Sequence, residues 1–492
     1  MITGKNRAVL EKVKAILRQA WPRHDVRALA PNAASLTGAA LIALGAMSFQ
    51  ASLYLPGWLP GFPGGPSWIA VGVALLLALG FAFSIAATMR LDLARCRWPG
   101  RLARWAALPL LIWALLSSAR SLGMLQSEFL ASLTQSPPQY RSDELYYNQY
   151  NAILTLRGEN PYTGANIHFV EAMSYFRISG YTPIARGQFA NLTHEPAATP
   201  MRAPLARYFA SPNSPPPEIA PDTIHSYPAG SFLVDVPFIW AGLPGMGVAQ
   251  IALFLALVVA MTLIAPPEAR LPVLLLALCN PNLALSVGTI DFDIWWIAAI
   301  VGAWALERRG WLSGALLGVA CAVKQTAWFF APFYFLWIWR ERGMSEALKQ
   351  CAYALAAFAL INMPWIIASP QAWAGSLTLP LTLPLFPQGS GLVGLMLAGV
   401  LPRLPSRVFT VIEVVAWLGA MAWFWRVSRR TPYVGLLAPL LPLLFAWRSP
   451  ERYFLSVSLL AAAAMALMLR RAAQPAHPAS ASSSIRSATT PA

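Results

Sequence analysis

Apolar runs of membrane-spanning length recur along this chain, and short clusters of Arg and Lys separate them. About 20 consecutive apolar residues suffice for a helix that crosses a bilayer. Only 11% of the 492 residues are charged, whereas soluble domains carry roughly 25%. Because such a chain cannot cover a water-facing surface in the usual way, we predict an all-α polytopic protein embedded in a lipid bilayer.

The net charge of +16 does not indicate nucleic-acid binding. The basic residues stand between apolar runs, which is how charges orient a membrane protein, and they form no stripe interleaved with aromatic residues of the kind a nucleic-acid groove needs. The four cysteines lie in or beside apolar runs. This placement argues against a disulfide framework and a zinc site, and we expect no cofactor.

Charge placement predicts about twelve spans with both termini in the cytoplasm. The basic segment 1–30 has apolar residues at helical spacing, which favours an amphipathic helix on the inner leaflet; a solvated basic tail is the alternative. Each predicted span is an apolar run, and the limits are chosen so that the basic clusters between spans lie on the inner side. The spans are 33–55, 67–88, 105–125, 246–264, 270–287, 292–306, 310–323, 326–339, 348–368, 407–425, 432–447 and 452–470.

These spans divide the chain into five parts. The basic segment 1–30 precedes three spans in 31–125, an external loop over 126–231, a membrane bundle over 232–471 and a disordered cytoplasmic tail over 472–492. Two further apolar stretches, 228–242 and 390–402, do not fit the alternation of sides. We predict that they form one or two non-spanning helices at the outer surface. Short loops and an uncleaved basic N-terminus are typical of a bacterial inner (plasma) membrane protein.

This topology brings polar residues from distant segments to the external face. They are Asp143, Glu144, His225, Tyr227, Asp291, Asp293, Lys324, Gln325, Arg448, Arg452 and Tyr453. Ionisable residues at a bilayer are costly and usually mark a functional site. Arginine grips a phosphate with two parallel hydrogen bonds, and a carboxylate can take the proton of an attacking hydroxyl. The set therefore suits a reaction on a lipid-phosphate substrate.

Several of these residues also have a purely structural interpretation. Asp143 lies in a polar loop, where carboxylates are usually only solvated. Asp291 and Asp293 flank an apolar run and are able to cap a helix. Lys324 interrupts an apolar run and can extend its ammonium to the outer interface. His225 is a lone histidine near an interface, where a structural role is common.

The order of the motifs resembles a known family. The motifs are DELYY from Asp143, RGENPY from Arg157, Tyr227-Pro228, GTIDFD from Gly288, LSGALLGVACAVKQTAWFFAPFYF from Leu312 and RSPERYF from Arg448. Over about residues 140–455 this pattern resembles the GT-C superfamily of integral membrane glycosyltransferases. It is most similar to the bacterial polyprenol-phosphate-mannose-dependent mannosyltransferases, glycosyltransferase family 87 (DUF2029).

The resemblance implies an inverting glycosyltransferase. It would move mannose, or a similar hexose or pentose, from a polyprenyl-phosphate donor to a glycan, lipid or protein acceptor on the non-cytoplasmic side. The catalytic carboxylate would be Asp143, with Glu144 as the fallback. The cations at the donor phosphate would be Lys324 and, as a second contact, Arg448 or Arg452. The other polar residues would bind substrate: His225, Tyr227, Asp291, Asp293, Gln325 and Tyr453.

Three alternatives stay open at the level of sequence. The first is a divalent cation bound at the outer face, because Asp291-Phe292-Asp293 has the Asp-x-Asp form. A transporter or flippase for a lipid or polysaccharide precursor is the second; it predicts repeated halves around a midplane site, and we find no internal repeat. A non-catalytic membrane scaffold is the third, and it predicts that loss of the outer carboxylates is tolerated.

Overall fold

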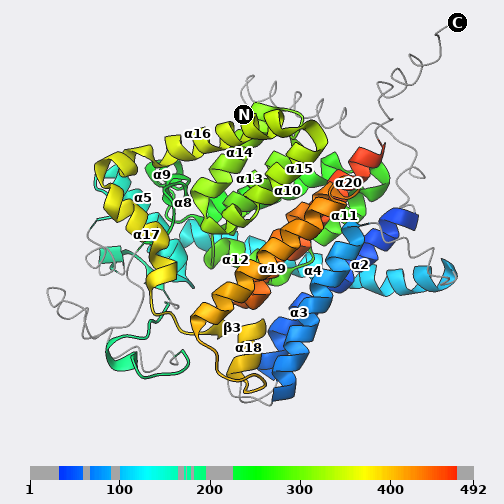
Figure 1. The fold of residues 1–492 in the computed structure, drawn as a ribbon, viewed down its shortest axis with the longest axis horizontal. Coiled ribbons are helices and arrows are strands. Elements are labelled where there is room, and N and C mark those ends of the chain that lie inside the picture. The colour runs from blue at the N-terminus through cyan, green and yellow to red at the C-terminus, as the bar shows by residue number, and fades with distance from the viewer. Residues whose placement is uncertain are drawn as a thin grey trace, which may run out of the picture.

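The computed structural model describes residues 33–58, 67–89, 100–163, 171–172, 174–178, 182–195 and 225–473. Within these residues the protein is all-α, apart from two pairs of two-residue strands and one isolated bridge. The predicted segment 1–30 and nearly all of the predicted tail lie outside the described residues. Figure 1 shows the long helices gathered into one bundle, with short elements at one end.

The N-terminal part consists of long helices followed by short elements. They are α2 (Ala33–Trp58), α3 (Ser67–Thr88), α4 (Gly100–Thr134), β1 (Gln139–Tyr140), α5 (Asp143–Leu156), β2 (Arg177–Ile178) and η2 (Gly187–Phe189). Helix α4 is longer than the predicted span 105–125. The first residues of the predicted external loop, 126–134, therefore continue this helix.

The C-terminal part holds most of the bundle. Its helices up to the middle are α8 (Gly230–Leu233), α9 (Val236–Trp240), α10 (Gly247–Ile264), η3 (Pro267–Ala269), α11 (Arg270–Leu278), α12 (Pro281–Thr289), α13 (Asp293–Ala305), α14 (Gly310–Val323) and η4 (Gln325–Phe329). The remaining elements are α15 (Ala331–Arg342), α16 (Met344–Ala368), α17 (Pro370–Thr382), β3 (Gln388–Gly389), α18 (Leu392–Leu397), α19 (Ser406–Val427), η5 (Pro432–Leu436), η6 (Ala438–Phe445), β4 (Arg448–Ser449), η7 (Glu451–Phe454) and α20 (Val457–Ala473).

Seven helices of the described chain are long and apolar enough to cross a membrane, and the bent pair α11–α12 would make an eighth. This confirms the predicted all-α membrane architecture but does not show twelve spans. The difference lies in short apolar helices such as α13, which has 13 residues. A helix of that length extends only about 20 Å, less than the ~30 Å hydrocarbon core.

The two stretches predicted not to span are divided into short helices. The first contains α8 and α9, with four and five residues, and the second contains α18, with six residues. The predicted span 270–287 is bent by 61° between α11 and α12. Asn280 caps α12 there by accepting hydrogen bonds from the backbone N–H groups of residues 282 and 283, and Pro281 occupies the first helical position. Both features are typical of a helix start.

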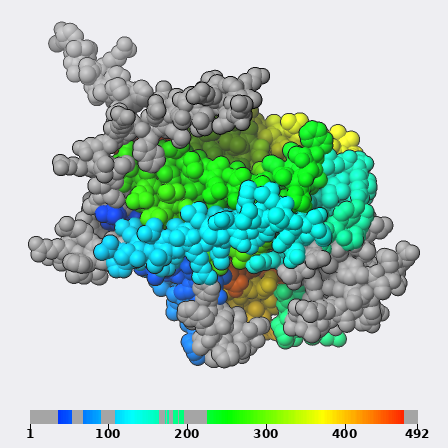
Figure 2. Space-filling model, turned by 180° about the vertical axis from the view of Figure 1, so that it is seen from behind, coloured from blue at the N-terminus to red at the C-terminus, as the bar shows by residue number. Residues whose placement is uncertain are grey.

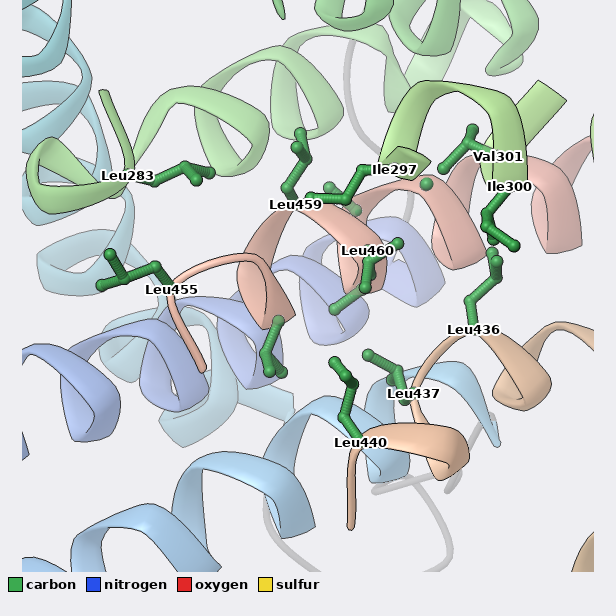
Figure 3. Close-up of a cluster of buried hydrophobic side chains, with 14 of the residues drawn as sticks. Leu283, Ile297, Ile300, Val301, Leu436, Leu437, Leu440, Leu455, Leu459 and Leu460 are labelled. Carbon is green, nitrogen blue, oxygen red and sulfur yellow. The ribbon is translucent and has the colours of Figure 1, made fainter. Parts of the chain in front are cut away.

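Helix α20 lies at the centre of the bundle. Of its membrane window, 83% is buried inside the molecule, and no other candidate span among the described residues exceeds 50%. Figure 3 shows Leu459 and Leu460 of α20 among side chains from α12, α13, η5 and η6. Seen from behind, α4 (cyan) lies across the outside of the green segments of the bundle, where it packs on α10, α11 and α12 (Figure 2).

Helices α2 and α3 support the segment that precedes α20. The ring of Phe454 stacks on Phe49 of α2, with centroids 6.4 Å apart, and meets Phe81 of α3 edge-on at 5.7 Å. Such aromatic pairs stabilise a packing arrangement beyond the burial of their surface. The N-terminal helices therefore fix the position of residues 451–454, which include two predicted site residues.

Candidate functional site

The start of α5 places two carboxylates side by side. Ser142 is the N-cap, and its hydroxyl accepts a hydrogen bond from the Glu144 backbone N–H at 3.2 Å. Asp143 and Glu144 follow in the first turn, where the positive end of the helix dipole favours negative charge. Their side chains have different surroundings: Glu144 is buried, whereas Asp143 is half-buried. The two residues are therefore suited to different roles.

Glu144 and Asp293 form buried ion pairs with Lys324. The Lys324 Nζ lies 2.8 Å from Glu144 Oε1 and 2.6 Å from Asp293 Oδ1, and all three side chains are at most 13% exposed. Burial acts to lower the pKa of Lys324, but the charges of Asp293 and Glu144 outweigh it and raise that pKa above its usual value. The lysine is thus held as a cation. Its Nζ also lies 5.0 Å from the ring centre of Phe292 and 5.5 Å from that of Tyr227, within cation–π range.

The carboxylates of Glu144 and Asp293 also accept hydrogen bonds from uncharged donors. The Tyr227 hydroxyl donates to Glu144 Oε2 at 3.1 Å, and the Phe292 backbone N–H donates to Glu144 Oε1 at 3.4 Å. The Trp296 indole donates to Asp293 Oδ1 at 2.9 Å. Both oxygens of Glu144 are therefore occupied, which leaves this residue poorly placed to accept a proton from a substrate.

Asp291 lies behind this network. Its carboxylate accepts hydrogen bonds from the Ser286 hydroxyl and, at 3.3 Å, from the Asp293 backbone N–H. Burial, followed by the charges of Asp293 and Glu144, raises the pKa of Asp291 to about 7. The chain turn between α12 and α13 is thus stabilised by Asp291. No group of three or more His, Cys, Asp or Glu side chains among the described residues is arranged to hold a metal ion.

A close approach between backbones brings Tyr227 and Lys324 to the same network. A Cβ atom added to Gly230 of α8 would lie 2.5 Å from the Ala322 carbonyl oxygen at the end of α14. Only glycine permits this contact. Helix α14 ends at Lys324, whose backbone is extended (φ −149°, ψ 142°). The short helix after Tyr227 therefore packs directly on the helix end that carries the lysine.

Asp143 lies on the other side of the α5 N-terminus. Its Oδ2 accepts a hydrogen bond from the Thr182 backbone N–H at 2.6 Å, and its Oδ1 accepts one from the Ser142 hydroxyl at 3.3 Å. Within the described part of the chain, Asp143 makes no ion pair. It is therefore the more available of the two loop carboxylates.

Arg448 is held by partners that the sequence did not indicate. Its guanidinium donates to the Phe386 carbonyl at 3.2 Å and to the Gln388 side chain, and it lies 3.9 Å from Glu195 Oε2. Strand β4 positions it by pairing in parallel with β3, Arg448 opposite Gln388. Gly389, with φ +123°, allows this pairing, because a Cβ there would lie 2.0 Å from the Ser449 carbonyl oxygen.

Arg452 has few partners for a half-buried guanidinium. Its hydrogen bond is to the Ser142 hydroxyl at 3.5 Å, and it makes no ion pair with any described residue. The charges of Glu144 and Asp143 stabilise its cationic form, and its own charge acts in turn on Arg448. Most of its donors are thus unused beside the Asp143 carboxylate.

The remaining predicted residues surround this centre. The Gln325 amide donates to the Ser226 carbonyl, and Tyr453 interacts electrostatically with Arg452. The His225 ring lies 5.8 Å from that of Tyr227, and its Nε2 is 3.4 Å from the Ser231 hydroxyl. His225 and Gln325 therefore support the chain around Tyr227, whereas Tyr453 lies beside the arginine.

The structure thus brings the predicted residues together in two adjoining groups. A buried group contains Glu144, Asp293 and Lys324, and a more open group contains Asp143 and Arg452. Sequence reasoning missed Ser142, Glu195 and Gln388. Ser142 carried the signal of a helix N-cap; Glu195 and Gln388 carried none, because only the folded loops bring them to Arg448.

Comparison with known families adds one decisive observation. Residues 225–449 match the model of glycosyltransferase family 87. This confirms the resemblance over 225 of the 492 residues, and the match indicates a membrane glycosyltransferase. No curated protein and no solved structure matches the chain.

The family 87 match covers α8 to α19 of the bundle, without α2, α3, α4 and α20, and only part of the candidate site. Lys324, Asp293 and Arg448 lie inside the matched region, whereas Asp143 and Arg452 lie outside it. The contacts of α5 and η7 with the matched region join the two parts, through the Lys324–Glu144 ion pair and the Arg452–Ser142 hydrogen bond.

An apolar groove lies along two helices of the bundle. Two neighbouring cavities of about 210 and 250 Å³ lie along α15 and α16 and share Phe335 and Cys351 as lining residues. The first begins at Cys321 and Trp328, close in sequence to Lys324. Almost all of the lining is apolar, so the groove suits a hydrocarbon chain.

Proposed function

We propose that this glycosyltransferase uses a polyprenyl-phosphate-linked sugar, mannose or a similar hexose or pentose, and acts at the non-cytoplasmic face with Asp143 as the general base. One observation carries the proposal. Asp143, a carboxylate without an ion pair in the described chain, lies beside Arg452, an arginine with unused donors. This juxtaposition offers a proton acceptor and a phosphate-binding cation at one place.

The reaction follows from these two groups. An acceptor hydroxyl attacks the anomeric carbon and gives its proton to Asp143. The bond between the anomeric carbon and the phosphate oxygen breaks, and polyprenyl phosphate leaves with the bonding electrons. Arg452, supported by Arg448, stabilises the charge that develops on the leaving phosphate. A single displacement of this kind inverts the anomeric centre.

Lys324 takes a different part in this proposal from the arginines. Two carboxylates already neutralise its ammonium at 2.8 and 2.6 Å, so a donor phosphate would have to displace Glu144 or Asp293 to reach it. We infer that Lys324 chiefly positions these carboxylates, with Arg452 as the first contact of the phosphate. In this proposal Tyr227, Asp293 and Tyr453 contact the sugar, and the buried Asp291 supports them.

The lipid tail of the donor would occupy the groove along α15 and α16. Because the groove begins near Trp328 and continues past Phe335, a long isoprenoid chain would lie in it while the phosphate stays at the arginines. Because the tail leaves lipid and not water, the groove would select the donor by van der Waals packing and shape.

The distribution of charge supports the proposed sidedness. Arg308 and Arg309 follow the end of α13 opposite Asp293, and Arg470 lies at the end of α20 opposite Arg452. Arginines flanking spans favour the cytoplasmic side, which leaves the candidate site outside. With both termini cytoplasmic, as in a bacterial inner membrane, we retain twelve crossings as part of the proposal, the short helices α13, α14 and α15 included.

Purified protein in detergent tests the donor. It should transfer labelled sugar from a polyprenyl-phosphate donor to an extract of membrane glycans, and transfer from a nucleotide sugar should be absent. Transfer from the nucleotide sugar alone would refute the proposed donor. Lipid movement across sealed vesicles without transfer in detergent would favour the transporter instead.

Cysteine labelling tests the sidedness. A membrane-impermeant thiol reagent should label a Glu159→Cys variant in intact cells, because Glu159 is an exposed residue just after α5. An Arg309→Cys variant should react only after the membrane is permeabilised. The reverse pattern would place the candidate site in the cytoplasm and contradict the proposal.

A further inference from the structure

A second cavity lies far from the candidate site. It has a volume of about 260 Å³ and is formed by the end of α13, the turn after it, η5 and the end of α20. Four arginines, one glutamate, one tyrosine and three apolar residues line it: Arg308, Arg309, Arg470, Arg471, Glu307, Tyr433, Ala305, Leu306 and Leu467.

Two helices separate this cavity from the candidate site. Helix α13 begins at Asp293 and ends at Ala305, beside the cavity. The segment from Arg452 to Arg470 contains most of α20, which is about 25 Å long at 1.5 Å per residue. In Figure 1 the end of α20 (red) lies at the opposite side of the bundle from β3. The cavity therefore belongs to a separate site.

The arginines at this cavity exceed the charge that neighbouring carboxylates neutralise. Arg342 lies 3.7 Å from Glu307, and Arg471 lies 2.6 Å from Glu341. Arg309 makes no ion pair with any described residue, and the same is true of Arg470. Glu307 is the single carboxylate among the lining residues, against four arginines, so the cavity is positive.

The lining indicates the chemistry of a ligand. Guanidinium groups bind phosphate oxygens in pairs, and Arg309 and Arg470 approach from segments that are 161 positions apart in the sequence. Leu306 and Leu467 give the cavity an apolar wall. Basic pockets between membrane helices on the cytoplasmic side bind anionic lipid headgroups.

We propose that this cavity binds a phosphate group, with Arg309 and Arg470 as its principal contacts. An anionic phospholipid of the inner leaflet and a soluble phosphate or diphosphate offer the same chemistry. The apolar wall favours the phospholipid. The site lies apart from the glycosyltransferase centre and does not depend on the proposed transfer reaction.

Thermal unfolding in nanodiscs tests the proposal. The protein is compared in phosphatidylcholine alone and in phosphatidylcholine mixed with phosphatidylglycerol, and in neutral nanodiscs with added inorganic pyrophosphate. The anionic lipid should raise the unfolding temperature of the wild type. An Arg309→Gln/Arg470→Gln variant should lose most of this increase and retain at least tenfold less phosphatidylglycerol by native mass spectrometry.

The matched control is Arg429→Gln/Arg430→Gln, which removes the same charge at the end of α19. It should keep the wild-type response. If both variants lost the increase in unfolding temperature equally, general surface charge would explain it and the proposal would be overturned. A wild type whose unfolding temperature responds to neither anion would also overturn it. A response to pyrophosphate alone, lost only in the Arg309/Arg470 variant, would keep the phosphate site but assign it a soluble ligand.

A folding defect is separated from a binding defect by a second variant. Arg309→Lys/Arg470→Lys keeps the charge and loses the paired hydrogen bonds, so it should unfold like the wild type in neutral lipid and show a reduced response to phosphatidylglycerol. A full response would overturn the arginine-specific contact.

Discussion

Lys324 Nζ lies 2.8 Å from Glu144 Oε1, although 180 positions separate the two residues in the chain. The ion pair joins α5 to the region that matches the family 87 model. Because Asp293 contacts the same ammonium at 2.6 Å, one lysine holds two carboxylates in place. The candidate site therefore depends on a buried charge network that connects three segments.

Replacing Lys324 should destabilise the protein. A Lys324→Met variant leaves Glu144 and Asp293 buried without their cation, and removing one partner of a buried pair costs about 3–5 kcal/mol. Thermal unfolding in detergent should show a marked decrease in Tm. Adding Glu144→Gln should recover part of the loss, and strictly additive effects of the two substitutions would contradict the network.

Asp143→Asn should abolish most sugar transfer. Loss of a general base lowers the rate by about 10²- to 10⁴-fold, while the amide oxygen can still accept the hydrogen bond from Thr182. The unfolding temperature should therefore stay near that of the wild type. Glu159→Gln, at an exposed carboxylate beyond the same helix, is the control. Normal turnover in the Asp143 variant would move the base to another residue.

Arg452→Gln should weaken use of the donor. A hydrogen bond to a charged group contributes about 1.5–3 kcal/mol, so kcat/KM should fall roughly 10- to 100-fold. Arg452→Lys keeps the charge without the fork and should be intermediate. Arg403→Gln removes an exposed arginine that donates to the Thr193 carbonyl and should have no effect. Unchanged kinetics in Arg452→Gln would exclude this arginine as the phosphate contact.

Asp291 should make stability depend on pH. Its folded pKa is raised to about 7, whereas an unfolded Asp titrates near 3.9. Between these values the folded state holds a proton that the unfolded state has released, so stability falls as pH rises from about 4 to about 7. Asp291→Asn should flatten this dependence in unfolding experiments. An equal slope in both proteins would show that Asp291 is not the titrating group.

Cys351→Trp should block long-chain donors. Cys351 lines both cavities of the apolar groove, so an indole there would obstruct an isoprenoid tail. Transfer from a long-chain donor should fall at least tenfold, a change of about 1.4 kcal/mol, while a short-chain donor should react normally. Leu360→Trp, at a position 78% exposed on the same helix, is the control. Equal rates with both donors would place the tail elsewhere.

The sequence predicted which residues meet but not how they pair. Charge clusters predicted that Asp143, Lys324 and Arg452 would reach one end of the bundle, since spans alternate in direction. The ion pair of Lys324 with Glu144 was not predictable, because it depends on the close contact of α8 with the end of α14. The sequence alone favours a phosphate contact for Lys324, because its two carboxylate partners become visible only in the folded protein.

The number of spans was harder to predict from composition. Apolar runs do not reveal where a helix breaks inside the membrane bundle. The break between α11 and α12 had a signal, the Asn280-Pro281 pair, and the predicted span 432–447 contains two 3₁₀ helices with three prolines. Hydropathy measures only how favourably each side chain enters the membrane. The helix breaks depend instead on backbone hydrogen bonding, which prolines and N-cap residues interrupt.

Helix α20 leaves the ribosome after every other described helix, yet it fills the middle of the bundle, where it contacts α2, α3, α10, α11 and α13. Before α20 is synthesised, the faces of those helices that contact it in the folded protein are uncovered. They stay so until synthesis reaches the alanine run at residues 461–464. Assembly of this enzyme is then completed by its final insertion step, and a nascent chain stalled before that step would have an open, protease-sensitive bundle.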